Sequence, residues 1–175
     1  RSGYAESIPY PVFKKKALLE IGGYNESLLR NQDNDLNNRL IKKGYKLFTT
    51  DKTSCKYFVD YSFQKMFSYA FNNGKWNAKT LFVNFRALKF HHFVPAAFTI
   101  YVFTIPIVMY LLYSNPMLKV IYFYLAPLFI YFAISIYETS KCAIKYPSFS
   151  ILKMPIIFFR FHFSYGLGTI RGLLN

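Results

Sequence analysis

The feature that most constrains this chain is a stretch without charged residues at positions 93–113, FVPAAFTIYVFTIPIVMYLLY. A helix of about 20 residues spans about 30 Å, which is the thickness of the hydrocarbon core of a bilayer. Such a stretch is hard to bury in the core of a chain of 175 residues. Residues 93–113 are therefore predicted to form a transmembrane helix, and the uncharged residues 120–137 a second one.

Residues 149–170 are also rich in apolar side chains, but Lys153, Arg160 and His162 interrupt the run. A third membrane span and a helix lying in the interface both fit this pattern. Residues 93–175 are thus predicted to form a transmembrane region with two to three helices.

Charged residues are concentrated before the apolar stretch. Residues 1–92 hold 16 of the 22 Lys and Arg residues and 7 of the 8 Asp and Glu residues. This basic half is expected to face the cytoplasm, because positive residues stay on that side of the inner membrane. It is expected to attract membrane lipid and phosphate-bearing substrates. Nucleic acid is not an expected partner, because the lysines are scattered and no nucleic-acid-binding motif accompanies them.

Residues 62–92 interleave aromatic side chains with Lys, Arg and Asn. Aromatic rings and long basic side chains suit the headgroup zone, where each has one apolar and one polar neighbour. These residues are predicted to form an amphipathic interfacial segment. Trp76, the only tryptophan, fits two roles there, an interfacial anchor and a platform that stacks on a sugar ring.

Residues 1–61 carry signals of short helices and strands. The expected elements are a helix at 12–23 that Gly22 or Gly23 ends, a helix from an Asn31 or Asp33 cap to Gly44, and strands at 45–49 and 54–59. In the second helix Leu36, Leu40 and Ile41 are predicted to form the buried face, turned away from Asp33.

The densest group of polar residues is GGYNESLLRNQDNDLNNR at positions 22–39. Two glycines allow the backbone to run close to a ligand. A carboxylate at a helix start can be held in one rotamer by neighbouring amides, which suits a general base. Capping of a surface helix is the alternative explanation of Asp33 and Asp35, because acidic residues favour such positions.

The runs I-G-G-Y-N-E, R-N-Q-D-N-D-L and R-L-I-K-K-G-Y resemble family 2 (GT-A type) membrane glycosyltransferases, notably the succinoglycan subgroup that builds exopolysaccharides. That subgroup carries G-G-[FY]-[DN]-E followed by an E-D pair. The resemblance, over most of residues 8–95, implies an α/β fragment at 1–61, the C-terminal part of a GT-A nucleotide-diphospho-sugar transferase domain, followed by α-helical transmembrane segments. It also implies that Asp33 is the catalytic base, while Gln32 replaces the Glu of the pair.

The same resemblance implies which residues bind substrate. Asn72-Asn73-Gly74-Lys75-Trp76 is similar to the Q-x-x-R-W motif that many members carry near the acceptor and donor phosphates. Lysine in place of arginine keeps the positive charge but loses the bidentate fork. The substrate-binding residues expected on this basis are Gly22, Gly23, Tyr24, Arg30, Gln32, Lys75 and Trp76.

The family's nucleotide-binding half is expected upstream of Arg1. Its D-x-D motif holds the donor diphosphate through a divalent cation, Mg or Mn, whose ligands are therefore expected outside this chain. Asp33-Asn34-Asp35 has the letters of that motif but lies at the E-D position, so no metal is assigned to it. The chain alone is consequently expected to be inactive.

The leading expectation is a glycosyltransferase that moves a sugar from a nucleotide-sugar donor to a lipid-linked or polysaccharide acceptor, with inversion and with Asp33 as general base. The alternative is a non-catalytic, membrane-anchored module in which residues 1–92 bind a lipid surface or a protein partner. The replacement of Glu by Gln32 gives that alternative its weight.

Overall fold

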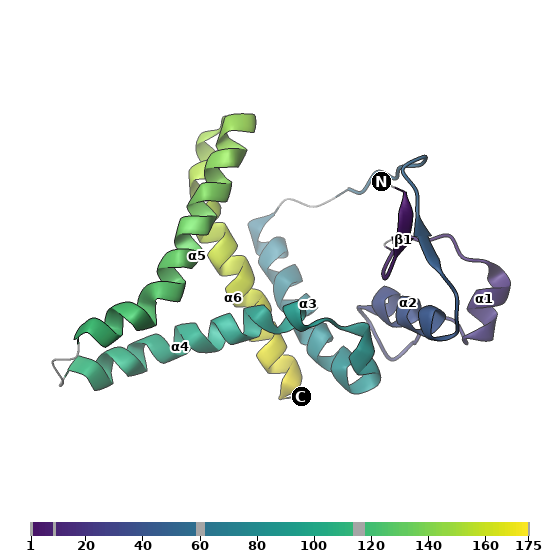
Figure 1. Cartoon of the computed structure of the whole chain (residues 1–175), viewed down its shortest axis with the longest axis horizontal. Helices are drawn as coiled ribbons and strands as arrows, with labels where there is room; N and C mark the ends of the chain where they lie inside the picture. Colours follow the sequence, from purple (N-terminus) through teal and green to yellow (C-terminus); the bar gives the residue numbers. More distant parts are fainter. Residues whose placement is uncertain (1, 9, 59–61, 114–117, 175) are drawn as a thin grey trace.

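The computed structural model of the chain describes residues 2–8, 10–58, 62–113 and 118–174. Its elements are β1 (Gly3–Ala5), α1 (Lys15–Glu20), α2 (Gln32–Lys42), β2 (Leu47–Thr49), α3 (Phe63–Asn84), α4 (Val94–Tyr113), α5 (Leu118–Lys145) and α6 (Met154–Leu173). Short 3-10 turns occupy Phe85–Ala87, Phe90–Phe93 and Phe149–Lys153. Figure 1 shows β1, β2, α1 and α2 gathered at one end of the molecule, beside the long helices α3 to α6.

A small core holds the N-terminal part together. β1 and β2 pair in antiparallel fashion, with Tyr4 opposite Phe48. The core cluster comprises the buried side chains of Ala17, Leu36, Leu40 and Leu47, from α1, α2 and β2. Four buried apolar side chains make a small core for an independent fold, so the contacts of this part with α3 matter to its stability.

Several expected element boundaries in this part are wrong. The helix expected at 12–23 spans Lys15–Glu20, and the expected strand at 45–49 shortens to β2 and pairs with β1, which carried no strand signal. Residues 54–58 have no regular structure and are exposed, since no neighbouring strand pairs with them; Val59 lies outside the described residues. Leu36 and Leu40 are buried as expected, but Ile41 is 39% exposed, because it lies about 100° around the helix from Leu40.

α4 and α5 are the two long helices that the uncharged stretches predict, and Figure 1 shows them as a V-shaped hairpin whose arms are closest at the end of α4 and the start of α5. The segment Phe90–Leu112, which starts in the 3-10 turn before α4, and the segment Val120–Lys145 of α5 are long and apolar enough to cross a membrane. Only 11% and 6% of their apolar windows is buried inside the structure. Soluble monomers rarely expose contiguous apolar surface of this extent, so the hairpin favours association with a membrane.

α6 packs along α3 and crosses the start of α4, rather than standing apart as a third apolar helix. A Cβ at Gly168 would overlap the carbonyl oxygen of Phe71, and one at Gly74 would overlap that of Tyr165. Gly166 meets the carbonyl of Pro95 in α4 in the same way. Small residues let helix backbones approach closely in membrane proteins, so these glycines determine how α6 fits against both helices.

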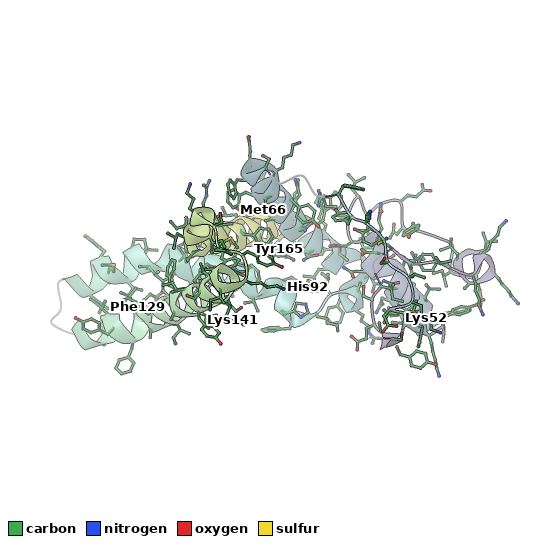
Figure 2. All side chains as sticks on the ribbon, turned by 90° about the horizontal axis from the view of Figure 1, so that it is seen from above. Lys52, Met66, His92, Phe129, Lys141 and Tyr165 are labelled. Carbon is green, nitrogen blue, oxygen red and sulfur yellow. The ribbon has the colours of Figure 1, made fainter. Side chains whose placement is uncertain are left out.

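The segment expected to be interfacial, 62–92, consists of α3 and the two 3-10 turns that follow it. One face of α3 is buried at Ala70, Gly74 and Ala78, and Phe82 is 75% exposed. Viewed from above, His92 at the end of this segment lies between Lys52 of the N-terminal part and Phe129 of the hairpin (Figure 2). The segment therefore joins the polar part of the molecule to the apolar helices.

Candidate functional site

The Gly22–Gly23 pair ends α1. The Gly22 N–H donates to the Leu19 carbonyl at 3.1 Å, and the Gly23 N–H donates to the Leu18 carbonyl at 2.9 Å. This is the Schellman arrangement of a helix C-terminus. Both glycines have positive φ, +76° and +72°, with open space where a Cβ would lie. The turn itself thus favours glycine at both positions, and it leaves the backbone accessible.

Arg39 of α2 fastens this turn to the rest of the structure. Its Nη1 donates to the Ile21 carbonyl and its Nη2 to the Gly23 carbonyl, at 2.7 Å each. Its Nε donates to the Asp35 carboxylate at 2.8 Å. Asp35 is 2% exposed and also accepts from Nδ2 of Asn84 in α3 at 2.8 Å. Asp35 is therefore a structural carboxylate that joins α2, α3 and the glycine turn.

Asp33, the expected base, lies in the first turn of α2 and is exposed. Its carboxylate has no hydrogen bond or ion pair with the residues that the structure describes. The reason expected for this exposure is wrong, because Leu40 lies about 20° from Asp33 around the helix at about 100° per residue. Asp33 is exposed because it lies in the first turn of α2, before Leu36, which is the first residue of this helix in the core cluster.

The loop before α2 docks on α3. Arg30 Nη1 donates to Asn73 Oδ1 at 2.7 Å, and its guanidinium carbon lies 4.9 Å from the centroid of the Tyr69 ring. The next residue, Asn31, donates from Nδ2 to Asn77 Oδ1. The structure thus brings R-N-Q-D-N-D and N-N-G-K-W to one place, through bonds between residues more than 40 positions apart in sequence.

Asn31 occupies the N-cap position of α2 without acting as a side-chain cap. Its backbone is left-handed, with φ 61°, and its side chain makes no bond to the first turn. The amide bonds to Asn77 instead, and Asn77, which is 3% exposed, donates to the hydroxyl of Tyr165 in α6. Asn31 is therefore the N-cap by position, as one of the two expected alternatives, but its side chain bonds to α3 instead of capping the first turn, and Asp33 lies inside the helix.

Gln32 supports the same loop from within. Its Nε2 donates to the carbonyl oxygen of Leu28, whose side chain is 1% exposed. A glutamate carboxylate has no proton to donate to a carbonyl. Glutamine at this position is thus explained by the loop that it stabilises.

Lys75 and Trp76 are half-buried on α3. Lys79 Nζ lies 5.1 Å from the centroid of the Trp76 ring. Tyr24 is exposed, with its ring 6.4 Å from that of Phe13 between centroids. Of the expected substrate-binding residues, Arg30 bonds directly to the N-N-G-K-W motif, whereas no recorded hydrogen bond or ring contact of the described residues joins Trp76 or Tyr24 to Asp33.

A polar stripe on α3, which was not expected from the sequence, receives α2 and its preceding loop. The stripe comprises Asn73, Asn77, Thr80 and Asn84. Spacings of four, three and four residues place these side chains on one helical face. The signal was present in the sequence as polar residues at helical spacing in an otherwise apolar and basic segment.

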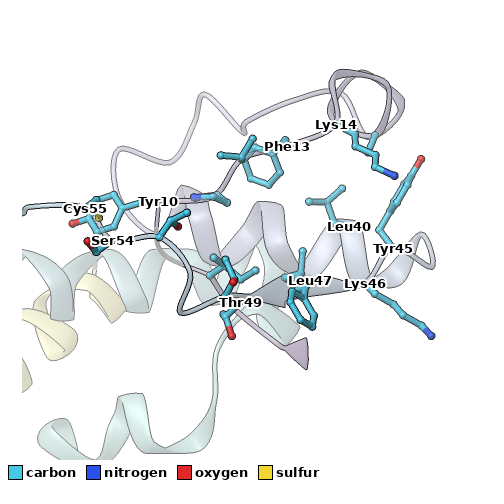
Figure 3. A pocket seen from close by; sticks show the side chains of 17 residues that line it. Tyr10, Phe13, Lys14, Leu40, Tyr45, Lys46, Leu47, Thr49, Ser54 and Cys55 are labelled. Carbon is cyan, nitrogen blue, oxygen red and sulfur yellow. The ribbon is translucent and has the colours of Figure 1, made fainter. Parts of the chain in front are cut away.

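Two cavities adjoin the N-terminal part. One of about 720 Å³ lies among Phe13, Leu40, Tyr45, Leu47 and Cys55, with none of the expected site residues in its lining (Figure 3). The other, of about 510 Å³, lies where α2 meets the turns before α4. Asn34, the neighbour of Asp33, contributes to its wall.

The described residues do not fit a divalent cation site. They contain no group of three His, Cys, Asp or Glu side chains close enough to hold a metal ion. In Asp33-Asn34-Asp35, the carboxylate of Asp35 is already engaged by Arg39 and Asn84. Asp33 and Asp35 therefore do not converge on a common ligand.

Comparison with known proteins identifies one similar sequence. The chain is 35% identical over 85 residues to the succinoglycan biosynthesis protein ExoA of Rhizobium meliloti (strain 1021). The match covers 49% of this chain and 26% of that protein, so the chain spans about a quarter of the length of its relative. No family model matches the chain, and no solved structure matches it. The similarity supports a relationship at the level of a family, in agreement with the motifs in residues 22–39.

Proposed function

We propose that this chain is part of a membrane glycosyltransferase of exopolysaccharide biosynthesis. The enzyme would move a sugar from a nucleotide-sugar donor to a lipid-linked or polysaccharide acceptor. The observation that carries the proposal is Asp33, an exposed carboxylate without a partner among the described residues, on a helix whose preceding loop is bonded to the N-N-G-K-W motif through Arg30 and Asn73. The similarity to a succinoglycan biosynthesis protein supports it.

In the proposed reaction Asp33 takes the proton of the acceptor hydroxyl. The hydroxyl oxygen forms a bond to the anomeric carbon of the donor sugar as the bond from that carbon to the nucleoside diphosphate breaks. Displacement from the opposite side inverts the anomeric carbon. A carboxylate that is not already neutralised by an ion pair is suited to accept this proton.

The other residues of the site would position Asp33 and the acceptor. Arg30, Asn31 and Gln32 hold the loop from which α2 starts. Gly22, Gly23 and Tyr24 would offer accessible backbone and an exposed ring to the acceptor sugar. Lys75 and Trp76 would contribute charge and an aromatic surface at the membrane edge. All of these roles rest on the proposed reaction.

Donor binding is assigned, in this proposal, to residues outside the chain. A divalent cation, Mg or Mn, held there would neutralise the charge of the diphosphate leaving group. The chain would supply the acceptor side and the membrane anchor, with its catalytic part on the cytoplasmic side of the inner membrane. Without the donor half, residues 1–175 alone would not transfer sugar.

The test is Asp33→Asn in the complete membrane enzyme, assayed by transfer of labelled sugar. Asparagine keeps the size and cannot accept the proton, so kcat should fall by about 10² to 10⁴-fold with little change in the KM for the nucleotide sugar. Glu26→Gln is the matched control, because it removes an exposed carboxylate from the same loop. Wild-type transfer rates in the Asp33→Asn variant would refute Asp33 as the general base and favour the non-catalytic, membrane-anchored module.

A further inference from the structure

The basic side chains that line the cleft of about 510 Å³ come from residues just before the first apolar helix, α4. Its lining includes Arg86 from the first 3-10 turn after α3, and Lys89, His91 and His92 from the turn that leads into α4. Phe90, the first residue of the apolar span Phe90–Leu112, lies between Lys89 and His91 in the sequence. In a membrane the cleft would therefore lie at the level of the lipid headgroups.

The charge of this cleft depends on Arg86. Lys89 forms an ion pair with Glu6, the one acidic residue in the lining, so these two contribute no net charge. The Arg86 side chain is exposed and has no ion pair or hydrogen bond with the described residues; its backbone carbonyl accepts from Asn38 Nδ2 at 3.1 Å. The Arg86 guanidinium is thus available to bind a ligand, and the hydrogen bond from Asn38 holds the Arg86 backbone in place.

The two histidines add imidazole groups beside this charge. The rings of His91 and His92 lie 4.4 Å apart between centroids, and both side chains line the cleft. His92 Nδ1 is engaged with the backbone of Lys89 at 3.1 Å, which fixes the orientation of its ring. A guanidinium flanked by imidazoles is a donor set that suits the oxygens of a phosphate group.

We propose that this cleft binds the phosphate group of an anionic membrane lipid. A lipid is favoured over a free phosphate because Phe90 beside the cleft is 87% exposed, and so is suited to insert among acyl chains. The exposed apolar face of α4 continues from it, with Ile100 and Phe103 each more than half exposed. The headgroup would lie against Arg86 while the acyl chains follow α4. This site does not depend on Asp33 acting as a base.

The experiment measures binding of short-chain phosphatidylglycerol to the full chain in neutral detergent, by isothermal titration calorimetry. Phosphatidylcholine of the same chain length and inorganic phosphate are the comparison ligands. Arg86→Gln should weaken phosphatidylglycerol binding about fivefold, since one basic residue near an anionic lipid surface contributes about 1 kcal/mol. Arg86→Lys should retain most of the affinity, because lysine keeps the positive charge and loses only the bidentate hydrogen bonding of the guanidinium.

Lys42→Gln is the matched control. Lys42 is an exposed lysine on α2 outside the cleft, so its loss removes the same charge without touching the site. Equal weakening by Lys42→Gln and Arg86→Gln would show diffuse attraction and overturn the site. Equal affinity for phosphatidylcholine, or inorganic phosphate binding as tightly as phosphatidylglycerol, would overturn the anionic lipid as its ligand. Circular dichroism of each variant confirms that the helices are retained.

Discussion

The hydrogen bonds of Asn77 connect the loop before α2 to α6, and the double-mutant cycle of Asn77→Ala with Tyr165→Phe tests that connection. Asn77 is 3% exposed, accepts from Asn31 and donates to the Tyr165 hydroxyl. Phenylalanine at 165 leaves a buried amide N–H of Asn77 without its acceptor. Alanine at 77 leaves Asn31 with its weaker bond to Thr80 at 3.3 Å and takes the donor from Tyr165.

The expected magnitude follows from the bonds that each change breaks. An unsatisfied buried polar group costs about 1–3 kcal/mol, so each single variant should lose about that much free energy of unfolding. The double variant should lose less than the sum, because removing Asn77 already breaks the bond to Tyr165. A coupling free energy of about 1 kcal/mol or more is expected for two residues in one network.

Denaturation of the purified chain in detergent, followed by circular dichroism, gives the four free energies. If the complete protein is the proposed transferase, transfer assays then show whether Asn77→Ala also lowers kcat, as expected if Asp33 shifts with its helix. Strictly additive free energies of unfolding would refute the connection. An unchanged kcat in a variant of reduced stability would confine the role of Asn77 to folding.

Three further changes have outcomes that the structure specifies. Gly168→Val should lower the free energy of unfolding by about 3 kcal/mol or more, because the valine side chain would overlap the Phe71 carbonyl. The control Leu173→Val, at an exposed position, should have little effect. Equal unfolding temperatures of the two variants would contradict the packing of α6 on α3. Asp35→Asn should lower the free energy of unfolding by about 1–3 kcal/mol, because both carboxylate oxygens accept hydrogen bonds and an amide nitrogen cannot. Denaturation measures this loss, and wild-type stability of the variant would contradict the geometry. A membrane-impermeant maleimide should label the exposed Cys55 and Cys142 from the same side of the membrane, because Cys142 lies in the last turn of the second span, Val120–Lys145, and a hairpin returns the chain to the side where it started. Labelling from opposite sides would exclude the hairpin.

The long apolar helices and the C-terminus of α1 were predictable from local sequence. Uncharged runs of sufficient length allow few conformations other than a helix in or near a membrane, and paired glycines after a short helix mark its end. The role of Asp35 was not predictable in this way. Capping of a surface helix is the alternative that the sequence offers for Asp35, but Asp35 is buried and bonded to Arg39 and to Asn84, which lies almost 50 residues away, so it is structural.

The β1 strand and the packing of α6 on α3 depend on long-range partners. Residues 3–5 contain no strand signal of their own, and they become a strand because β2 offers free backbone groups beside them. Gly168 and Gly172 lie four residues apart on α6, the spacing at which small residues let helices meet, yet the sequence does not say which helix they meet. Only the structure shows that their partner is α3, where the small residues Ala70, Gly74 and Ala78 are buried.

α3 presents a stripe of small residues and, beside it, the polar stripe. Among the described side chains of the polar stripe, that of Asn77 bonds both to the loop before α2 and to α6, and the geometry of the two stripes explains this. At about 100° per residue, the small residues Ala70, Gly74 and Ala78 span about 80° of the helix surface, and the polar stripe lies beside them. Asn77 falls about 20° from Ala70, at the boundary between the stripes. Its oxygen therefore reaches Asn31 before α2 while its nitrogen reaches Tyr165 of α6. A shift of α6 along α3 would consequently act first on the start of α2, where Asp33 lies.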